Sequence, residues 1–137
     1  MAFIDNSDEV IRELERRMAA ALDACGQTAV THAKDIITAG VPRNADGTST
    51  GALKNSIEHQ SDAQECVIGT NLSYAIYNEY GTGIYADGGG RQTPWAYQDA
   101  KGQWHRTNGM TPLHFLKNAV ANHVSEYRRI IKQYIED

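Results

Sequence analysis

The feature that most constrains the fold is a long helical stripe of apolar residues near the N-terminus. Apolar side chains recur every three or four residues from Val10 to Ile37, which is the spacing of one face of an α-helix. Gly40 and Pro42 then predict a helix end, because glycine readily forms a left-handed cap and proline cannot continue a helix. The sequence therefore predicts one helix over residues 6–40, about 45–50 Å long at 1.5 Å per residue.

Gly26 lies in the middle of this predicted helix. A glycine at such a position destabilises a helix by about 1 kcal/mol relative to alanine. Two interpretations stay open. The glycine either marks a bend or the close approach of another helix, or it is simply tolerated.

A second amphipathic stripe ends the chain. Apolar residues with helical spacing run from Leu113 to Tyr134, and Thr111 followed by Pro112 is a typical helix start, with threonine as N-cap and proline at the first helical position. These features predict a helix over residues 111–136. Its apolar stripe must be buried against another element.

Two short segments between these helices predict an antiparallel hairpin over residues 52–70. "ALKNSIEHQS" and "ECVIGT" are interpreted as strands, with Asp62, Ala63 and Gln64 as the loop between them. Such a ribbon needs a helix to cover it. The chain, residues 1–137, is thus predicted to be one α+β domain in which two long helices pack on a small antiparallel sheet.

Residues 71–110 hold both tryptophans, five of the seven tyrosines and the densest glycine of the chain. "SYAIYNEYG" favours a short helix closed by Gly81, although a strand also suits its pattern. "TPWAYQDAKGQWHRT" favours a hairpin that turns at residues 99–102 and sets Tyr97 opposite Trp104. This region is expected to form a projecting aromatic hairpin or loop.

We expect these aromatic side chains to contact other protein chains. A long loop in a small domain is usually functional, and Tyr and Trp are enriched where interfaces gain their binding energy. The alternative is that the rings fold back over the sheet, since exposed apolar patches are rare in monomers. The predicted interface residues are Tyr74, Tyr77, Glu79, Tyr80, Thr82, Tyr85, Trp95, Tyr97 and Trp104.

Composition and charge argue against several classes of protein. A net charge of −4 disfavours a protein whose main task is to bind nucleic-acid phosphates. No apolar run approaches the roughly 20 residues that span a bilayer, and the first residues do not resemble a signal peptide. Cys25 and Cys66 are too few for a disulfide scaffold. We therefore expect a cytoplasmic protein with no membrane partner and no sequence-specific nucleic-acid partner.

The residues give little support for catalysis. The histidines are His32, His59, His105, His114 and His123. No two of them share an i, i+4 or CxxC-like spacing, so no metal site or cofactor is predicted. Glu79, Asp87 and Asp99 could form the carboxylate cluster of a metal-dependent nuclease, but no motif sets their spacing. A non-enzyme is expected, with a metal-dependent DNA-processing enzyme as an alternative.

At "TGALKNSI", "TNLSYAIYNEYGTG" and "PWAYQDAKGQWHRTNGMTPLHFLKNAV" the chain resembles the tail-component or neck proteins of long-tailed double-stranded DNA bacteriophages and prophages. These proteins are also labelled minor capsid, tail-completion or head–tail joining proteins. The resemblance covers about residues 50–120, and residues 79–83, Trp95 and Thr111-Pro112 are among its most specific parts. His114 replaces the proline that usually precedes the phenylalanine, which leaves the start of the last helix open.

The resemblance implies a non-enzymatic morphogenesis protein that acts at the head–tail junction or in tail completion. Such proteins are expected to work as rings or other homo-oligomers and to contact neighbouring connector and tail proteins. Assembly would take place in the host cytoplasm, and the final location would be the head–tail interface or the tail of the virion. A tail terminator subunit is the alternative within this class.

Overall fold

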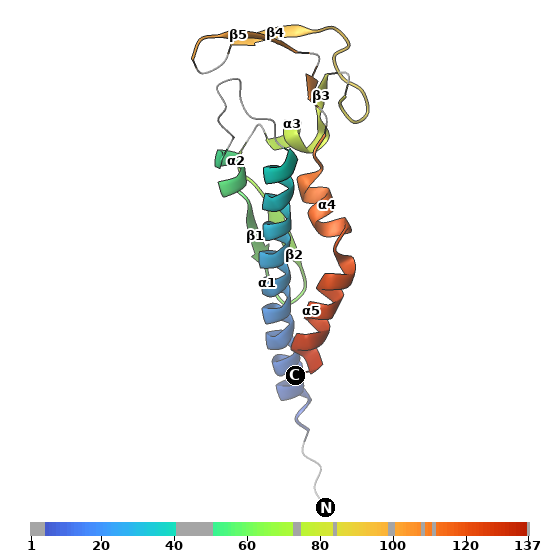
Figure 1. Cartoon of the computed structure of the whole chain (residues 1–137). Helices are drawn as coiled ribbons and strands as arrows, with labels where there is room; N and C mark the ends of the chain where they lie inside the picture. The colour runs from blue at the N-terminus through green and yellow to red at the C-terminus, as the bar shows by residue number, and fades with distance from the viewer. Residues whose placement is uncertain are drawn as a thin grey trace, which may run out of the picture.

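The computed structural model describes residues 5–40, 51–72, 75–83, 85–98, 101–107, 109–110 and 112–136. The fold is mixed α and β, as predicted. An elongated body consists of helices α1 (Ser7–Gly40), α4 (Phe115–Ala121) and α5 (Val124–Glu136) and of the hairpin formed by β1 (Glu58–Ser61) and β2 (Cys66–Gly69) (Figure 1). A ribbon of β4 (Trp95–Gln98) and β5 (Trp104–Thr107) extends across one end of this body, whereas the start of α1 and the end of α5 lie at the opposite end.

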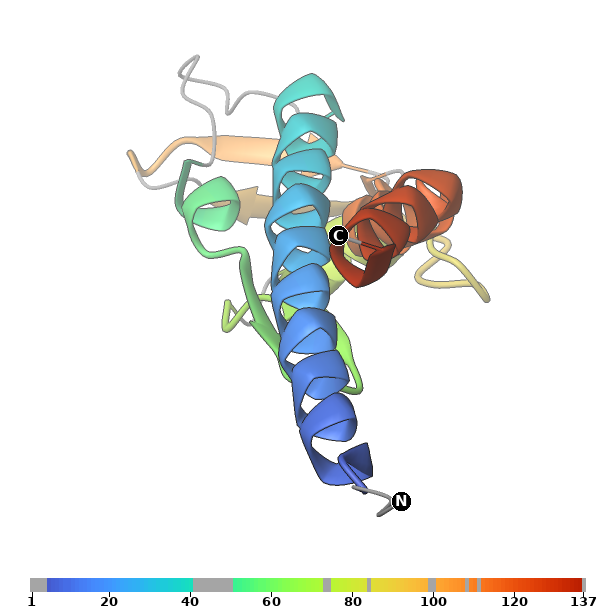
Figure 2. The ribbon, with the colours of Figure 1, turned by 90° about the horizontal axis from the view of Figure 1, so that it is seen from below.

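The predicted N-terminal helix is confirmed as α1 (Ser7–Gly40). Its buried hydrophobic residues follow one another at intervals of four, which places them on one stripe. They are Ala21, Cys25, Ala29, Ala33 and Ile37. In Figure 2, α4 and α5 lie on one side of α1, and α2 and the hairpin lie on the other. The rest of the body is therefore packed around this single helix.

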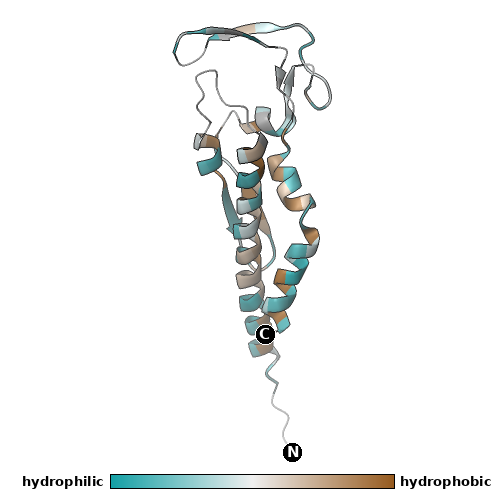
Figure 3. Cartoon of the chain, viewed as in Figure 1, coloured by the Kyte–Doolittle hydropathy of each residue, from teal (hydrophilic) through white to brown (hydrophobic). Residues whose placement is uncertain are grey.

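The C-terminal helix predicted over residues 111–136 starts later and is broken in two. It consists of α4 (Phe115–Ala121) and α5 (Val124–Glu136). The N-cap is His114, whose φ of 50° is left-handed, so the preceding chain cannot continue the helix. The predicted N-cap, Thr111, lies outside the described residues. Figure 3 shows apolar and polar residues interspersed along both helices.

Hydrogen bonds close α4 and hold α5 beside it. The N–H of His123 donates to the carbonyl of Val120, three residues back, which tightens the last turn of α4. The hydroxyl of Tyr127 donates to the carbonyl oxygen of Ala119 across the break. Burial, with a smaller contribution from the charge of Glu126, raises the pKa of Tyr127 to about 12. The break lets both helices follow α1.

The hairpin predicted over residues 52–70 is confirmed in its second part only. Strands β1 (Glu58–Ser61) and β2 (Cys66–Gly69) pair antiparallel. The preceding segment forms helix α2 (Gly51–Asn55) instead of a strand. A helical turn brings Leu53 and Ile57, four residues apart, to the same side, and both are buried.

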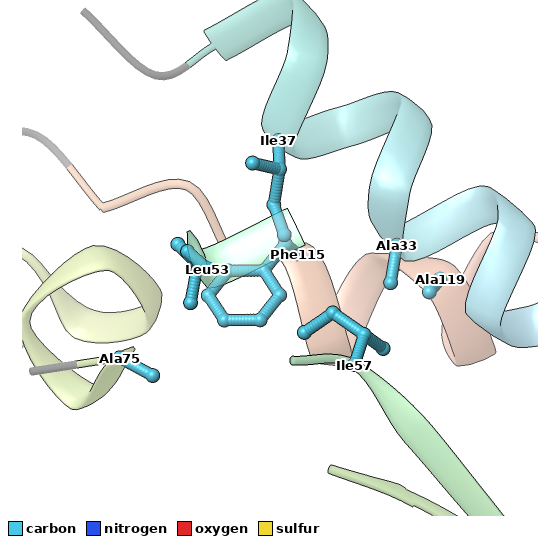
Figure 4. Packing of buried hydrophobic residues seen from close by; sticks show 7 residues of the cluster. All are labelled: Ala33, Ile37, Leu53, Ile57, Ala75, Phe115 and Ala119. Atoms are coloured by element: carbon cyan, nitrogen blue, oxygen red, sulfur yellow. The ribbon is translucent and has the colours of Figure 1, made fainter. Parts of the chain in front are cut away.

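The core lies at the end of the body that carries the ribbon. Figure 4 shows side chains converging there from α1, α2, α3 (Ala75–Tyr80) and α4. The cluster consists of Ala33, Ile37, Leu53, Ile57, Ala75, Phe115 and Ala119. Phe115 and Leu53 are its largest fully buried side chains, and each is expected to stabilise the fold by about 1.5–3 kcal/mol. The base of the ribbon therefore lies next to the hydrophobic core.

Gly26 marks a close approach, but the element that approaches is the β1–β2 hairpin and not a helix as predicted. A β-carbon at Gly26 would lie 2.4 Å from Cδ2 of His59 and 2.7 Å from Sγ of Cys66, both on the hairpin. The ring of His59 is held over the glycine by Asp23, whose Oδ1 lies 2.9 Å from Nε2. A side chain at this position would push the hairpin away from α1.

Replacing Gly26 with alanine should lower the free energy of unfolding. Alanine favours a helix by about 1 kcal/mol, but overpacking against the His59 ring and the Cys66 thiol typically costs about 1–3 kcal/mol. Urea denaturation followed by far-ultraviolet circular dichroism measures the net effect. Gly51→Ala is the matched control, because a β-carbon there meets no atom within 4 Å. A Gly26→Ala protein at least as stable as the unaltered chain would contradict the close contact.

Candidate functional site

The predicted short helix at "SYAIYNEYG" is confirmed as α3, and it presents large side chains to solvent. Gly81 ends it as predicted, with φ of 78° and an N–H that donates to the carbonyl of Tyr77. Ala75 is buried, whereas Ile76, Tyr77 and Tyr80 are each more than half exposed. The outer face of α3 is therefore apolar and aromatic.

Glu79 behaves differently from its neighbours on α3. Only 6% of the residue is exposed, and its carboxylate accepts the N–H groups of Leu116 at 2.9 Å and Lys117 at 3.0 Å. These N–H groups belong to the first turn of α4 and have no partner within that helix. Among the predicted interface residues, Glu79 therefore holds α4 in place from inside the fold.

Two of the carboxylates considered for a nuclease cluster make contacts within the fold. Oδ2 of Asp87 lies 3.1 Å from Nε2 of His114, and Glu79 binds the start of α4. Asp99 lies outside the described residues.

The two cysteines do not have the properties of nucleophiles. Cys25 and Cys66 are free thiols, and burial raises the pKa of each, which disfavours the thiolate that a nucleophile needs.

A pair of two-residue strands forms the base of the arm, as we name residues 81–107. Strand β3 (Thr82–Gly83) pairs antiparallel with β6 (Gly109–Met110). Gly109 has φ of 128°, and a β-carbon there would lie 2.0 Å from the carbonyl oxygen of Thr82. Only glycine allows this approach. Thr82 is half-buried in this base.

The outer part of the arm is the predicted hairpin, with a different register. Strand β4 (Trp95–Gln98) pairs with β5 (Trp104–Thr107), so Tyr97 lies opposite His105 and Trp104 lies opposite Gln98. The predicted Tyr97–Trp104 pair is therefore wrong by one residue. Five residues, 99–103, connect the strands, and within this connection the carbonyl of Gly102 (φ 82°) accepts the side-chain amide of Gln98 at 2.8 Å.

This register places the two tryptophans on opposite faces of the ribbon, because side chains alternate along a strand. Trp104 is 70% exposed. Trp95 is half-buried, and the guanidinium carbon of Arg91 lies 5.4 Å from the centre of its ring, which is cation–π distance. Tyr85, in the preceding loop, is also exposed.

Two predicted interface side chains lie outside what the structure describes. They are Tyr74 and the side chain of Tyr97. The described side chains of β4 and β5 are all exposed or half-exposed. The alternative in which the rings fold back over the sheet therefore does not apply to Trp104.

A groove in the body was not predicted from the sequence. It has a volume of about 710 Å³ and lies between β2, α3 and α4. Its rim includes Val67, Ile76 and Val120, each about half exposed. Val120 belongs to the apolar stripe of the last helix and was expected to face inward. No local signal distinguishes it, because its exposure results from where α4 packs.

The structure also brings together three metal-binding residue types from distant parts of the chain. His32 of α1 lies beside His123, at the break between α4 and α5, and beside Glu126 of α5. The spacing of His123 and Glu126, three residues apart, could have signalled a shared face. Nothing in the sequence connects either residue to His32.

The contact between Glu79 and α4 should contribute measurably to stability. Glu79→Ala removes the acceptor for two part-buried N–H groups at the start of α4, so the free energy of unfolding should fall by about 1–3 kcal/mol. Glu79→Gln keeps one acceptor oxygen and should recover part of this loss. Chemical denaturation measures both variants, with Glu58→Ala on the exposed part of β1 as the control. Unchanged stability of Glu79→Ala would show that water replaces the carboxylate.

Comparison with known proteins identifies the family. Among the described helices, none has the length and apolar character needed to cross a membrane. No curated protein matches the chain, and no solved structure matches it. The family model described as "Bacteriophage HK97-gp10, putative tail-component" matches residues 2–81, from α1 to the end of α3, which is more than half of the 137 residues. The chain therefore belongs to this family of bacteriophage tail components.

Proposed function

We propose that this tail component is a structural, non-enzymatic subunit that acts at the head–tail junction or in tail completion. It assembles as a homo-oligomer or ring and contacts neighbouring connector and tail proteins. The observation that carries this proposal is the 70% exposed indole of Trp104, on a ribbon that lies across the end of the body.

The ribbon has the properties of a segment that a partner covers. A two-stranded ribbon is marginally stable on its own in water. The side chains on the face of this ribbon that carries Trp104 are exposed, and Trp95 and Thr107 on the other face are half-buried. Burying the indole of Trp104 against a partner would remove a large apolar surface from water, which favours association. The base, in contrast, is tied to the core through Glu79 and His114. The arm is thus fixed at its base, while its aromatic surface remains accessible to a partner.

A second copy of the chain is the partner that the surfaces favour. The protruding aromatic arm and the apolar groove between β2, α3 and α4 are different places on one molecule. Two different, complementary surfaces produce head-to-tail contacts, which close into a ring when the rotation between copies allows it. In the proposed contact, the arm of one subunit lies on the groove of the next.

The central prediction is that Trp104→Ala prevents assembly without unfolding the subunit. The indole is exposed, so the stability of the monomer should change by no more than about 0.5 kcal/mol. Removing an aromatic side chain from the centre of an interface typically costs about 2 kcal/mol of binding free energy. Association should therefore weaken about 30-fold. Light scattering coupled to size-exclusion chromatography measures the oligomer. Tyr134→Ala, an exposed aromatic on α5 away from the arm, is the control, and equal assembly of both variants would rule out the arm as the contact.

A mixing experiment tests the head-to-tail geometry. Val120→Glu places a charge on the groove but leaves the arm intact, whereas Trp104→Ala leaves the groove intact. Each variant alone should remain monomeric, because every contact needs both surfaces. A mixture should form dimers, since the intact arm of one variant meets the intact groove of the other, but it should not form rings. A mixture that stays monomeric would contradict this pairing.

The role in the virion is tested by complementation. A phage or prophage that lacks this gene should produce unjoined heads and tails or incomplete tails in electron micrographs. The unaltered chain should restore infectious particles, and Trp104→Ala should not. Normal particles in the absence of the gene would overturn the proposed role at the head–tail junction or in tail completion.

A further inference from the structure

The strongest unassigned feature is the cluster of His32, His123 and Glu126 between α1 and the break that separates α4 from α5. Oε2 of Glu126 lies 3.0 Å from Nε2 of His32 and 3.5 Å from Nδ1 of His123. The two imidazole rings are stacked, with centroids 3.5 Å apart and planes 5° from parallel. One ligand atom from each residue lies within 4.8 Å of the other two. We propose that these three side chains bind a divalent transition-metal ion of the Zn²⁺ type.

The donor set fits this chemistry. Two imidazole nitrogens and one carboxylate oxygen are ligands that Zn²⁺ takes in proteins, often with a fourth position left to water. A single oxygen, Oε2 of Glu126, faces a nitrogen of each ring. A neutral imidazole has one N–H and one lone pair, so a metal ion at this point would replace the protons that bridge the nitrogens to the carboxylate.

The rings can reach the required orientation without disturbing the core. A metal ion lies in the plane of each imidazole that binds it, so the two parallel rings must turn relative to one another. Rotation of a histidine ring about the bond to Cβ meets only a broad, shallow barrier. The side chains are 22% exposed for His32, 32% for His123 and 37% for Glu126, which leaves room for this rotation and for a water ligand.

The position of the cluster gives the ion a structural role. His32 belongs to α1, His123 lies in the break directly before α5, and Glu126 belongs to the first turn of α5. A metal ion would therefore connect α1 to the break and to the start of α5. Because the cluster is separate from the arm and from the residues that line the groove, this inference does not rest on the proposed function.

The test uses the full chain without an affinity tag, treated with a chelator and then dialysed. Titration calorimetry with Zn²⁺ should show one ion bound per chain, and the midpoint of thermal unfolding should rise with added Zn²⁺. Co²⁺ should produce the visible absorption of a site with nitrogen and oxygen ligands. His32→Ala and His123→Ala should lose all three signals, while circular dichroism reports that they remain folded.

Two further variants keep the outcome decisive. Glu126→Gln preserves the size of the side chain and should weaken Zn²⁺ binding even if an alanine variant unfolds. His59→Ala is the matched control, because His59 also pairs with a carboxylate, that of Asp23, but stacks on no second ring among the residues that the structure describes. This control should bind Zn²⁺ as the unaltered chain does. Absence of stoichiometric Zn²⁺ binding, or equal binding by Glu126→Gln, would overturn the proposal and leave a histidine–carboxylate contact only.

Discussion

Packing against the buried stripe of α1 is the constraint on which the rest of the structure depends. Most residues of this stripe are small, and Gly26 beside it has no side chain at all. The hairpin, α4 and α5 can therefore approach the helix closely. The consequence is a slender body with few large buried side chains. Phe115 and Leu53 are the largest fully buried residues, and they concentrate the hydrophobic stabilisation at the end beside the arm.

This distribution of packing explains how an exposed ribbon can be held in a defined position. The buried carboxylate of Glu79 satisfies two N–H groups of α4, and His114 joins the same helix start to Asp87 of the arm. These contacts fix the base of the arm against the core, while Trp104 on the outer ribbon is 70% exposed. In a tail component, such an arrangement separates two tasks. The body stabilises the subunit, and under the proposed function the apolar surface of the arm is used for association.

Local patterns in the sequence predicted the elements that depend on neighbouring residues. The spacing of apolar residues predicted α1, and the tyrosines followed by Gly81 predicted α3 with its cap. Two elements were missed because each depends on distant contacts. Residues 51–55 form a helix since Leu53 must reach the core. The last helix is broken and starts at Phe115, where Glu79 supplies the cap. The ribbon was predicted, but its register was wrong by one residue.

The sequence by itself determined the class of the molecule: a long helix, a mixed α and β fold, an aromatic segment rich in glycine, and a resemblance to phage tail components. These properties follow from residue types and from the spacing of residues that are close in the sequence. Both can be identified within a short segment of the chain. Only the tertiary structure decided which side chains of that segment face outward, turning Glu79 inward and leaving Trp104 exposed. It also brought His32 to Glu126, 94 residues away. Contacts across such separations are set by helix packing, because no local pattern records which distant surfaces a helix will meet.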